Sequence, residues 1–196
     1  FEAPALSADK IWVLPAADGS ADQVLKTDGS GNLGFATTSG GGKIGQVLSA
    51  TKTDVFTTTS TSYTDITGIT INITPAATSS KILVTFSVTA STDTADRVFG
   101  FQLVRDSTAI GIGGTSSSRS VGTVAGTVET KNTKMNSYSM NFLDSPSSTS
   151  ELTYKLQTKA QTGGSNTVRI NSNGGDQDGG YNFRTISTIT VMEVLA

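Results

Sequence analysis

The residues that could do chemistry in this chain are mainly carboxylates, because the sequence contains neither Cys nor His. Without those residue types it cannot form disulfides, thiolate nucleophiles, imidazole bases or most transition-metal sites. The most closely spaced acids are Asp176 with Asp178, in a Gly-rich stretch, and Asp93 with Asp96. A glycosidase needs two carboxyl groups roughly 5–9.5 Å apart, one of them with a raised pKa. Acids in Gly-rich turns are solvated, so we expect no catalytic pair and predict that the chain is not an enzyme.

The spacing of Asp176 and Asp178 could also offer oxygen ligands to Ca²⁺. The stretch lacks the acidic ligand and the fixed turn that complete an EF-hand loop. A mobile polar loop is therefore the favoured interpretation, and we predict neither a metal nor a cofactor.

Recognition of a cell-surface glycan typically uses exposed aromatic side chains beside polar loops. Tyr181 directly follows the Gly-rich loop 173–180, with Arg184 close behind it. We hypothesise that Asp176, Asp178 and Tyr181 contribute to receptor binding, while the alternative is that Tyr181 begins a strand and packs. A competing polar loop spans residues 113–120 and carries Arg119.

The elements that must position these residues are strands. Thr is the most frequent residue and Glu is rare, which favours pleated sheets over helices. From Val55 onward apolar residues recur at strand spacing, most clearly between Lys81 and Ala90. No segment shows a sustained helical period. The pattern predicts strands at about 53–59, 62–73, 80–90, 97–105, 108–113, 121–130, 134–143, 150–160, 166–172 and 184–195.

Short strands separated by turn signals predict an antiparallel, jelly-roll-like β-sandwich head over residues 55–196. Because the last strand is so apolar, we expect it to lie inside its sheet rather than at an edge. The predicted core comprises Ile82, Val84, Phe86, Phe99, Phe101, Leu103, Phe142, Leu156, Ile189 and Val191.

Residues 1–54 predict a short β stalk built from repeats. Gln23-Val24-Leu25 lies between turn clusters and is echoed by Gln46-Val47-Leu48, although a flexible linker is the alternative. Too few apolar groups are present for this segment to fold alone, so we expect it to be ordered in a homotrimer. The apolar run Ile11, Trp12, Val13 and Leu14 is either a virion-anchoring patch or a surface that packs on the later domain.

Two long stretches of the sequence resemble a known group of proteins. Residues 12–19 and 23–33 are similar to a segment common in tail-fibre and other virion-surface proteins of bacteriophages, particularly marine ones. The later chain resembles the globular tip domain that often follows that segment. Its matching runs are Tyr63 to Gly68, Ser79 to Val84, Phe142 to Pro146 and Thr185 to Thr190. The resemblance implies a trimeric, non-enzymatic virion component.

Composition narrows the partners further. A net charge of −2 gives no basic surface for nucleic acid, and no apolar window is long enough to insert into a membrane. The absence of Cys fits assembly in a reducing host cytoplasm followed by work at the virion surface, and equally fits a cytoplasmic protein. We therefore expect a tail fibre or surface appendage whose partners are its own copies, other virion proteins and a host-surface glycan or protein. The alternatives are a capsid decoration or head-fibre protein and a carbohydrate-active enzyme.

Overall fold

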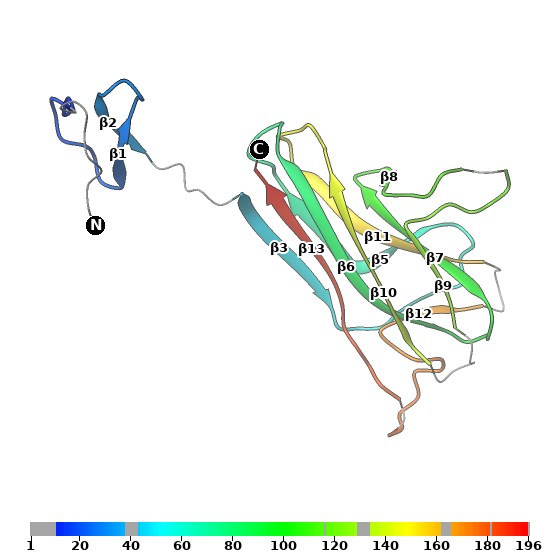
Figure 1. Cartoon of the computed structure of the whole chain (residues 1–196). Helices are drawn as coiled ribbons and strands as arrows, with labels where there is room; N and C mark the ends of the chain where they lie inside the picture. The colour runs from blue at the N-terminus through cyan, green and yellow to red at the C-terminus, as the bar shows by residue number, and fades with distance from the viewer. Residues whose placement is uncertain are drawn as a thin grey trace, which may run out of the picture. The chain divides into compact units, whose positions relative to one another are not determined.

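The computed structural model describes residues 11–37, 43–115, 117–128, 134–161, 166–180 and 182–195. The chain divides into two compact units, Phe1–Gly42 and Lys43–Ala196. Every regular element in the described ranges is a β-strand, as the composition predicts (Figure 1).

The first unit contains one antiparallel hairpin. Its strands are β1 (Gln23–Thr27) and β2 (Leu33–Thr37). The turn between them is held by Asp28, whose carboxylate accepts hydrogen bonds from the backbone N–H of Ser30 at 2.7 Å and of Asn32 at 3.2 Å. Gly29 and Gly31 adopt positive φ in this turn, which explains the repeated glycines.

The second unit, which we call the head, is built from two antiparallel sheets. The first sheet contains β3 (Ile44–Lys52), β4 (Phe56–Thr58), β6 (Lys81–Thr92), β10 (Asn136–Asp144), β12 (Val168–Ile170) and β13 (Ser187–Val194). Both β12 and β13 pair antiparallel with β6 on one edge, while β10 pairs with its other edge. In the same way β3 pairs with β13, and β4 with β12. The six strands therefore form a sheet only four strands wide. β3 and β4 follow one another along the same line, and so do β12 and β13.

The second sheet contains β5 (Thr64–Ile73), β7 (Val98–Arg105), β8 (Thr108–Ile110), β9 (Val124–Thr127) and β11 (Leu152–Ala160). Here β8 and β9 share one edge of β7, so five strands again fill four positions. The order of positions is β3/β4, β12/β13, β6, β10 in the first sheet and β5, β11, β7, β8/β9 in the second. Two four-position antiparallel sheets with these crossovers form a jelly roll. The predicted sandwich class is confirmed.

The core lies between the two sheets. In β6 the side chains of Ile82, Val84, Phe86 and Val88 are buried and alternate with more exposed ones, as the sequence pattern predicts. Of the predicted core, only Phe142 is less than fully buried, because it lies on the edge strand β10 and packs against the core from there. β13 lies between β3 and β6, which confirms that the last strand is internal.

The boundary between the units differs from the one expected at residues 54 and 55. Ile44–Lys52 pairs along nearly its whole length with β13, so it is an edge strand of the head and not part of a stalk. Gln23 and Gln46, the first residues of the two Gln-Val-Leu runs, thus belong to different units. The predicted strand at 53–59 is correspondingly wrong at its start, because β3 ends at Lys52 and β4 begins at Phe56.

Candidate functional site

A loop interrupts the first sheet between β12 and β13. Because both strands run in the same direction along β6, residues 171–186 leave the sheet and return to the same strand position (Figure 1). Asn171 and Asp176 adopt positive φ, with values of 64° and 43°, and Gly175 does so at 111°. These left-handed residues turn the backbone out of the sheet, and Asn, Asp and Gly are the residue types that tolerate this conformation best.

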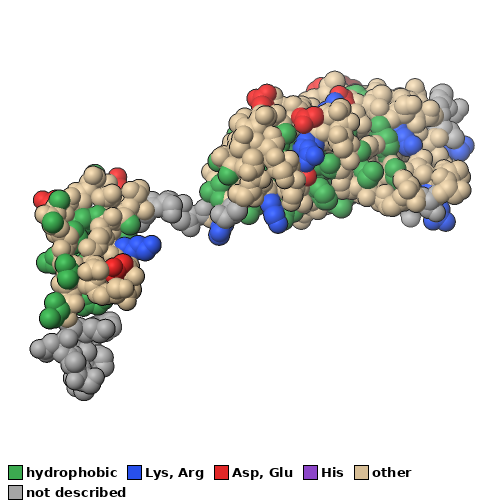
Figure 2. All heavy atoms as spheres, turned by 90° about the horizontal axis from the view of Figure 1, so that it is seen from above, with side chains coloured by type: hydrophobic (Ala, Val, Ile, Leu, Met, Phe, Trp, Pro, Cys, Tyr) green, Lys and Arg blue, Asp and Glu red, His purple; other side chains and the backbone are tan. Residues whose placement is uncertain are grey.

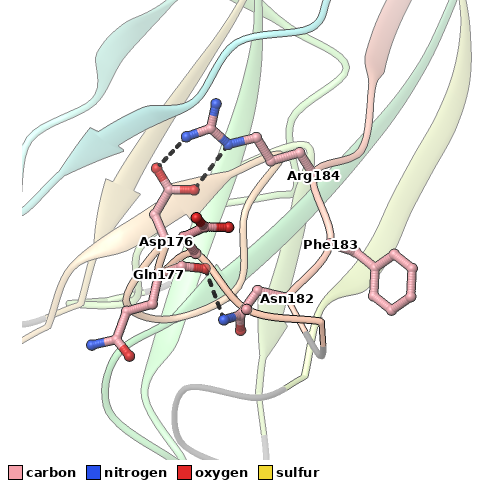
Figure 3. Close-up of a pocket in the computed structure, with 7 residues that line it drawn as sticks. Asp176, Gln177, Asn182, Phe183 and Arg184 are labelled. Atoms are coloured by element: carbon pink, nitrogen blue, oxygen red, sulfur yellow. Dashed lines mark hydrogen bonds and ion pairs between the residues drawn. The ribbon is translucent and has the colours of Figure 1, made fainter.

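The loop encloses an open pocket of about 390 Å³, lined by Asp176, Gln177, Asp178, Gly179, Asn182, Phe183 and Arg184 (Figure 3). Arg184 donates from Nε to Asp176 Oδ1 at 3.1 Å and from Nη2 to Oδ2 at 2.9 Å. Ser172 adds a hydrogen bond from Oγ to Asp176 Oδ1 at 3.0 Å. These bonds, those from Arg184 foremost, lower the pKa of Asp176 below its ordinary value.

Two amide side chains tie the far side of the same loop. Asn182 Nδ2 donates to the carbonyl of Gln177 at 2.8 Å, and Asn173 Nδ2 donates to Asn182 Oδ1 at 2.5 Å. The ring of Phe183 points away from this network and is 68% exposed (Figure 3). An exposed aromatic ring next to fixed amide and carboxylate groups can bind a polar ligand that also has an apolar face.

The structure thus brings the predicted Asp176 and Asp178 into one pocket, and Tyr181 lies outside the described residues. Sequence reasoning missed Phe183 as a site residue. Phe183 immediately precedes the last strand expected at 184–195, which in the structure begins only at Ser187. The signal that could have identified it is an aromatic residue between Asn182 and Arg184, just after a Gly-rich loop.

In each pair of acids singled out from the sequence, one acid has a lowered pKa. Burial raises the pKa of Asp93, but hydrogen bonds centred on Thr167 outweigh it, and the net shift is downward. Asp176 is ion-paired and also has a lowered pKa. A glycosidase acid needs the opposite shift, so neither Asp93 nor Asp176 suits that role. Among the residues that the structure describes, no group of three or more acids could hold a metal ion.

The second sheet has a comparable interruption between β8 and β9, where residues 111–123 leave the edge of β7. A pocket of about 590 Å³ beside this loop contains Arg119, the competing candidate. Tyr63 donates from its hydroxyl to the carbonyl of Val121 at 2.8 Å. Lys159 Nζ lies 5.0 Å from the centre of the Tyr63 ring and donates to Ser120 Oγ at 2.9 Å. Arg119 and Asp176 therefore line two different pockets on different sheets.

The predicted virion-anchoring run lies at the surface of the first unit. Val13 pairs with the hairpin turn through its N–H to Gly31 O at 3.0 Å and through its carbonyl, which accepts from Leu33 N at 2.8 Å. All four side chains from Ile11 to Leu14 are nevertheless exposed within this unit, and Ile11 is 81% exposed. Trp12 and Leu14 line a shallow apolar hollow with Leu25 and Leu33. Figure 2 shows hydrophobic side chains spread over the surface of this unit.

A buried acid in the head has partners on the opposite sheet. Asp144 accepts two hydrogen bonds from Arg105 Nη1, at 2.9 and 2.7 Å, and one from the Tyr154 hydroxyl at 2.7 Å. Burial, and then the neighbouring Asp144, raise the pKa of Tyr154. Because Asp144 is on the first sheet and the other two residues are on the second, this cluster joins the sheets.

The fold and its two loops define an antiparallel jelly-roll head joined to a small hairpin unit. No protein-family model matches the chain, and no curated protein matches it. Within the described ranges, no helix has the length and apolar character needed to cross a membrane.

Several solved structures are distantly similar to this chain. A structure of infectious bursal disease virus, Gx strain, has 14% identity and a TM-score of 0.41 over 93% of this chain and 41% of that one. A mutant VP2 protein of the same virus, from derived T=1 particles, has 17% identity and a TM-score of 0.38 over 84% of this chain and 39% of that one. A VP2 subviral particle of the virus has 14% identity and a TM-score of 0.38, over 83% and 44% of the two chains. The chain thus spans less than half the length of these viral proteins, and likeness at this level does not assign it a function.

Proposed function

We propose that this chain is a non-enzymatic virion-surface protein, a homotrimeric tail fibre or appendage that attaches the particle to its host. The observation that carries the proposal is that the two ends of the head differ: one end holds its first and last strands' termini, and the pockets lie toward the other. Leu195 N donates to Lys43 O at 2.7 Å, so the chain enters and leaves the head at one end. At the same end Ala76 N donates to Glu193 Oε1 at 2.6 Å. The head is covalently joined to the first unit at this end, because Lys43 is the first residue of the head.

Both pockets lie toward the opposite end of the head. The second pocket is lined by Tyr63, Val98 and Gln161, at the ends of the strands away from Lys43. The loop 171–186 leaves β6 beside Ala90, far along the strand from Lys81, which pairs with Val194. Binding residues commonly sit on loops held by a rigid scaffold. A head fixed at one end, with loop pockets toward the other, suits attachment.

The first unit supplies the virion-proximal part in this proposal. Its exposed run Ile11 to Leu14 is an apolar patch that a neighbouring virion protein or a second copy would cover. The resemblance of residues 12–19 and 23–33 to virion-surface proteins of bacteriophages points the same way.

For the receptor we propose a host-surface glycan held in the pocket of the loop 171–186. Phe183, whose ring points away from the amide network, would stack on a sugar ring beside the pocket, and Asp178 would accept hydrogen bonds from hydroxyl groups of the glycan. Asp176 would act through Arg184, because their ion pair fixes the shape of the pocket. Arg119 and its pocket form the competing site.

Competition for adsorption tests the proposal. Purified full-length chain should slow the adsorption of particles that carry it to host cells, and the double variant Phe183→Ala, Asp178→Ala should lose this effect while keeping the wild-type melting temperature. Arg119→Ala is the matched control and should compete like wild type. If only Arg119→Ala loses competition, the site moves to the second pocket. If wild type does not slow adsorption but binds tightly to purified capsids, the chain is a capsid decoration protein instead.

A further inference from the structure

Where β3, β13, β6 and β10 lie side by side, the outer face of the first sheet carries a regular array without charged side chains. In antiparallel strands, residues directly opposite each other point to the same face. Met192 lies opposite both Val47 and Leu83, and Leu83 lies opposite Leu143, which gives one apolar row across all four strand positions. Val47 is 54% exposed and Leu143 is 47% exposed. Single exposed apolar residues are ordinary, but a continuous row marks an interaction surface.

The next rows are polar and neutral. Thr190 lies between Ser49 and Thr85, and its hydroxyl is 2.9 Å from that of Ser49. With the apolar row, these rows form what we call the uncharged face: Val47, Ser49, Thr51, Leu83, Thr85, Ser87, Ser139, Asn141, Leu143, Thr188, Thr190 and Met192. Two cations lie at its ends: Lys81, opposite Val194, and Arg169 of β12, opposite Ser91.

The outer face of the second sheet is different. There Lys155 Nζ pairs with Asp65 Oδ2 at 2.8 Å, and Gln157 Nε2 donates to Asp65 Oδ1 at 2.7 Å. Lys159 continues the charged stripe along β11. A surface that meets only water is usually rich in charge, whereas the centre of an interface is depleted of it. The outer face of the second sheet therefore has the composition of a surface exposed to water, and the uncharged face of the first sheet has that of a covered surface.

We infer that the uncharged face is where copies of this chain contact one another, with a second copy as its occupant. The inference rests on the proposed homotrimer and names its contact surface. Four strand positions about 4.8 Å apart and nine residues at about 3.3 Å each give roughly 600 Å² of sheet, close to the roughly 800 Å² per partner of a standard interface. A neutral Ser/Thr/Asn array can hydrogen-bond to polar groups of a neighbouring copy, and carries no charge that the contact would have to desolvate.

Charge insertion tests the surface. Thr190→Glu places one carboxylate per copy on the uncharged face, and Thr70→Glu places the same change on the outer face of the second sheet, opposite Lys155. By light scattering we expect wild type and Thr70→Glu to be trimers and Thr190→Glu to be monomeric, with circular dichroism showing a folded head in each. A trimeric Thr190→Glu variant would overturn the assignment of this face and leave the proposed trimer standing. A monomeric wild type would overturn both.

Thiol labelling gives an independent readout, because the chain has no Cys of its own. Ser139→Cys lies on the uncharged face and Thr70→Cys on the charged one, and both positions are exposed in the single chain. In the assembled protein we expect maleimide to label Ser139→Cys at least about tenfold more slowly than Thr70→Cys, because a covered thiol reacts only when the contact opens. Equal labelling rates in a trimeric sample would overturn the inference even if Thr190→Glu failed to fold.

Discussion

Asn171 and Ser187 close the base of the loop that carries the candidate site. Ser187 Oγ donates to Asn171 Oδ1 at 2.6 Å, and both side chains are buried. Asn171 Nδ2 donates in turn to the carbonyls of Lys52 at 2.9 Å and Asp54 at 3.1 Å, where β3 gives way to β4. Ser187 Oγ accepts from Thr89 N at 3.1 Å. The side chains of Asn171 and Ser187 therefore hydrogen-bond to backbone groups at the two places where one strand of the sheet ends and the next begins: between β3 and β4, and between β12 and β13.

Removing the Ser187 hydroxyl should destabilise the head and loosen the loop. Ser187→Ala leaves Asn171 Oδ1 buried without its donor, so we expect a loss of about 1–3 kcal/mol in the free energy of unfolding. Urea denaturation measures that loss, and hydrogen exchange should be faster in residues 171–186. Ser150→Ala, at an exposed position, is the control. Equal stability of the two variants would show that the Asn171–Ser187 bond does not hold the loop.

Two phenylalanines should respond in opposite ways to truncation. Phe86 is 3% exposed between the sheets, so Phe86→Ala should cost about 3–5 kcal/mol and lower the melting temperature sharply. Phe183 is exposed on the loop, and Phe183→Ala should leave the melting temperature unchanged. Thermal melts followed by circular dichroism measure both. A shift within error for Phe86→Ala would contradict the assigned core face.

The bond between Asp144 and Arg105 should contribute more than a surface ion pair. Asp144→Ala removes the acceptor shared by Arg105 and Tyr154 and leaves both without it, at a cost of about 3 kcal/mol. Asp65→Ala breaks the exposed pair with Lys155 and should cost less than about 1 kcal/mol. Chemical denaturation of the two variants compares them directly. Similar losses would mean that the cluster does not stabilise the contact between the sheets.

Acid should weaken the head through Glu193. Burial raises the pKa of this carboxyl, but hydrogen bonds from Gln46 Nε2 and Ala76 N outweigh it, and the folded pKa lies below the ordinary 4.5. The stabilisation is therefore present above pH 4.5 and is lost as the pH falls through the lowered folded value.

A variant isolates that contribution. In Glu193→Gln the side-chain N–H₂ group faces one of the two donors, Gln46 Nε2 or Ala76 N, and cannot accept its hydrogen bond. This variant should therefore melt below wild type near neutral pH. The difference should shrink as the pH is lowered through the folded pKa of Glu193, because this carboxyl then becomes protonated in the wild type as well. Melts across this range test the effect, and a difference independent of pH would rule out titration of Glu193 as its cause.

Much of the head was predictable from local pattern alone. The alternation of Ile82, Val84 and Phe86 fixes which side of β6 is buried, because successive strand residues point to opposite faces whatever the neighbours are. The hairpin at Arg105 and Thr108 follows from the two residues between them, with Asp106 at positive φ. The absence of Cys and His limits the chemistry of the chain whatever fold it adopts.

Only the tertiary structure decided which of these segments meet. Ile44–Lys52 looked like a second stalk repeat, since its apolar pattern is weak and its partner β13 lies at the other end of the chain. Asn171 bonds to Lys52 and Ser187 because β12 and β13 share one strand position, which no local pattern encodes. The ion pair of Asp176 with Arg184, and the exposure of Phe183 beside it, likewise follow from how the loop closes. Side-chain alternation is a property of neighbouring residues, whereas strand pairing is set by contacts between distant ones.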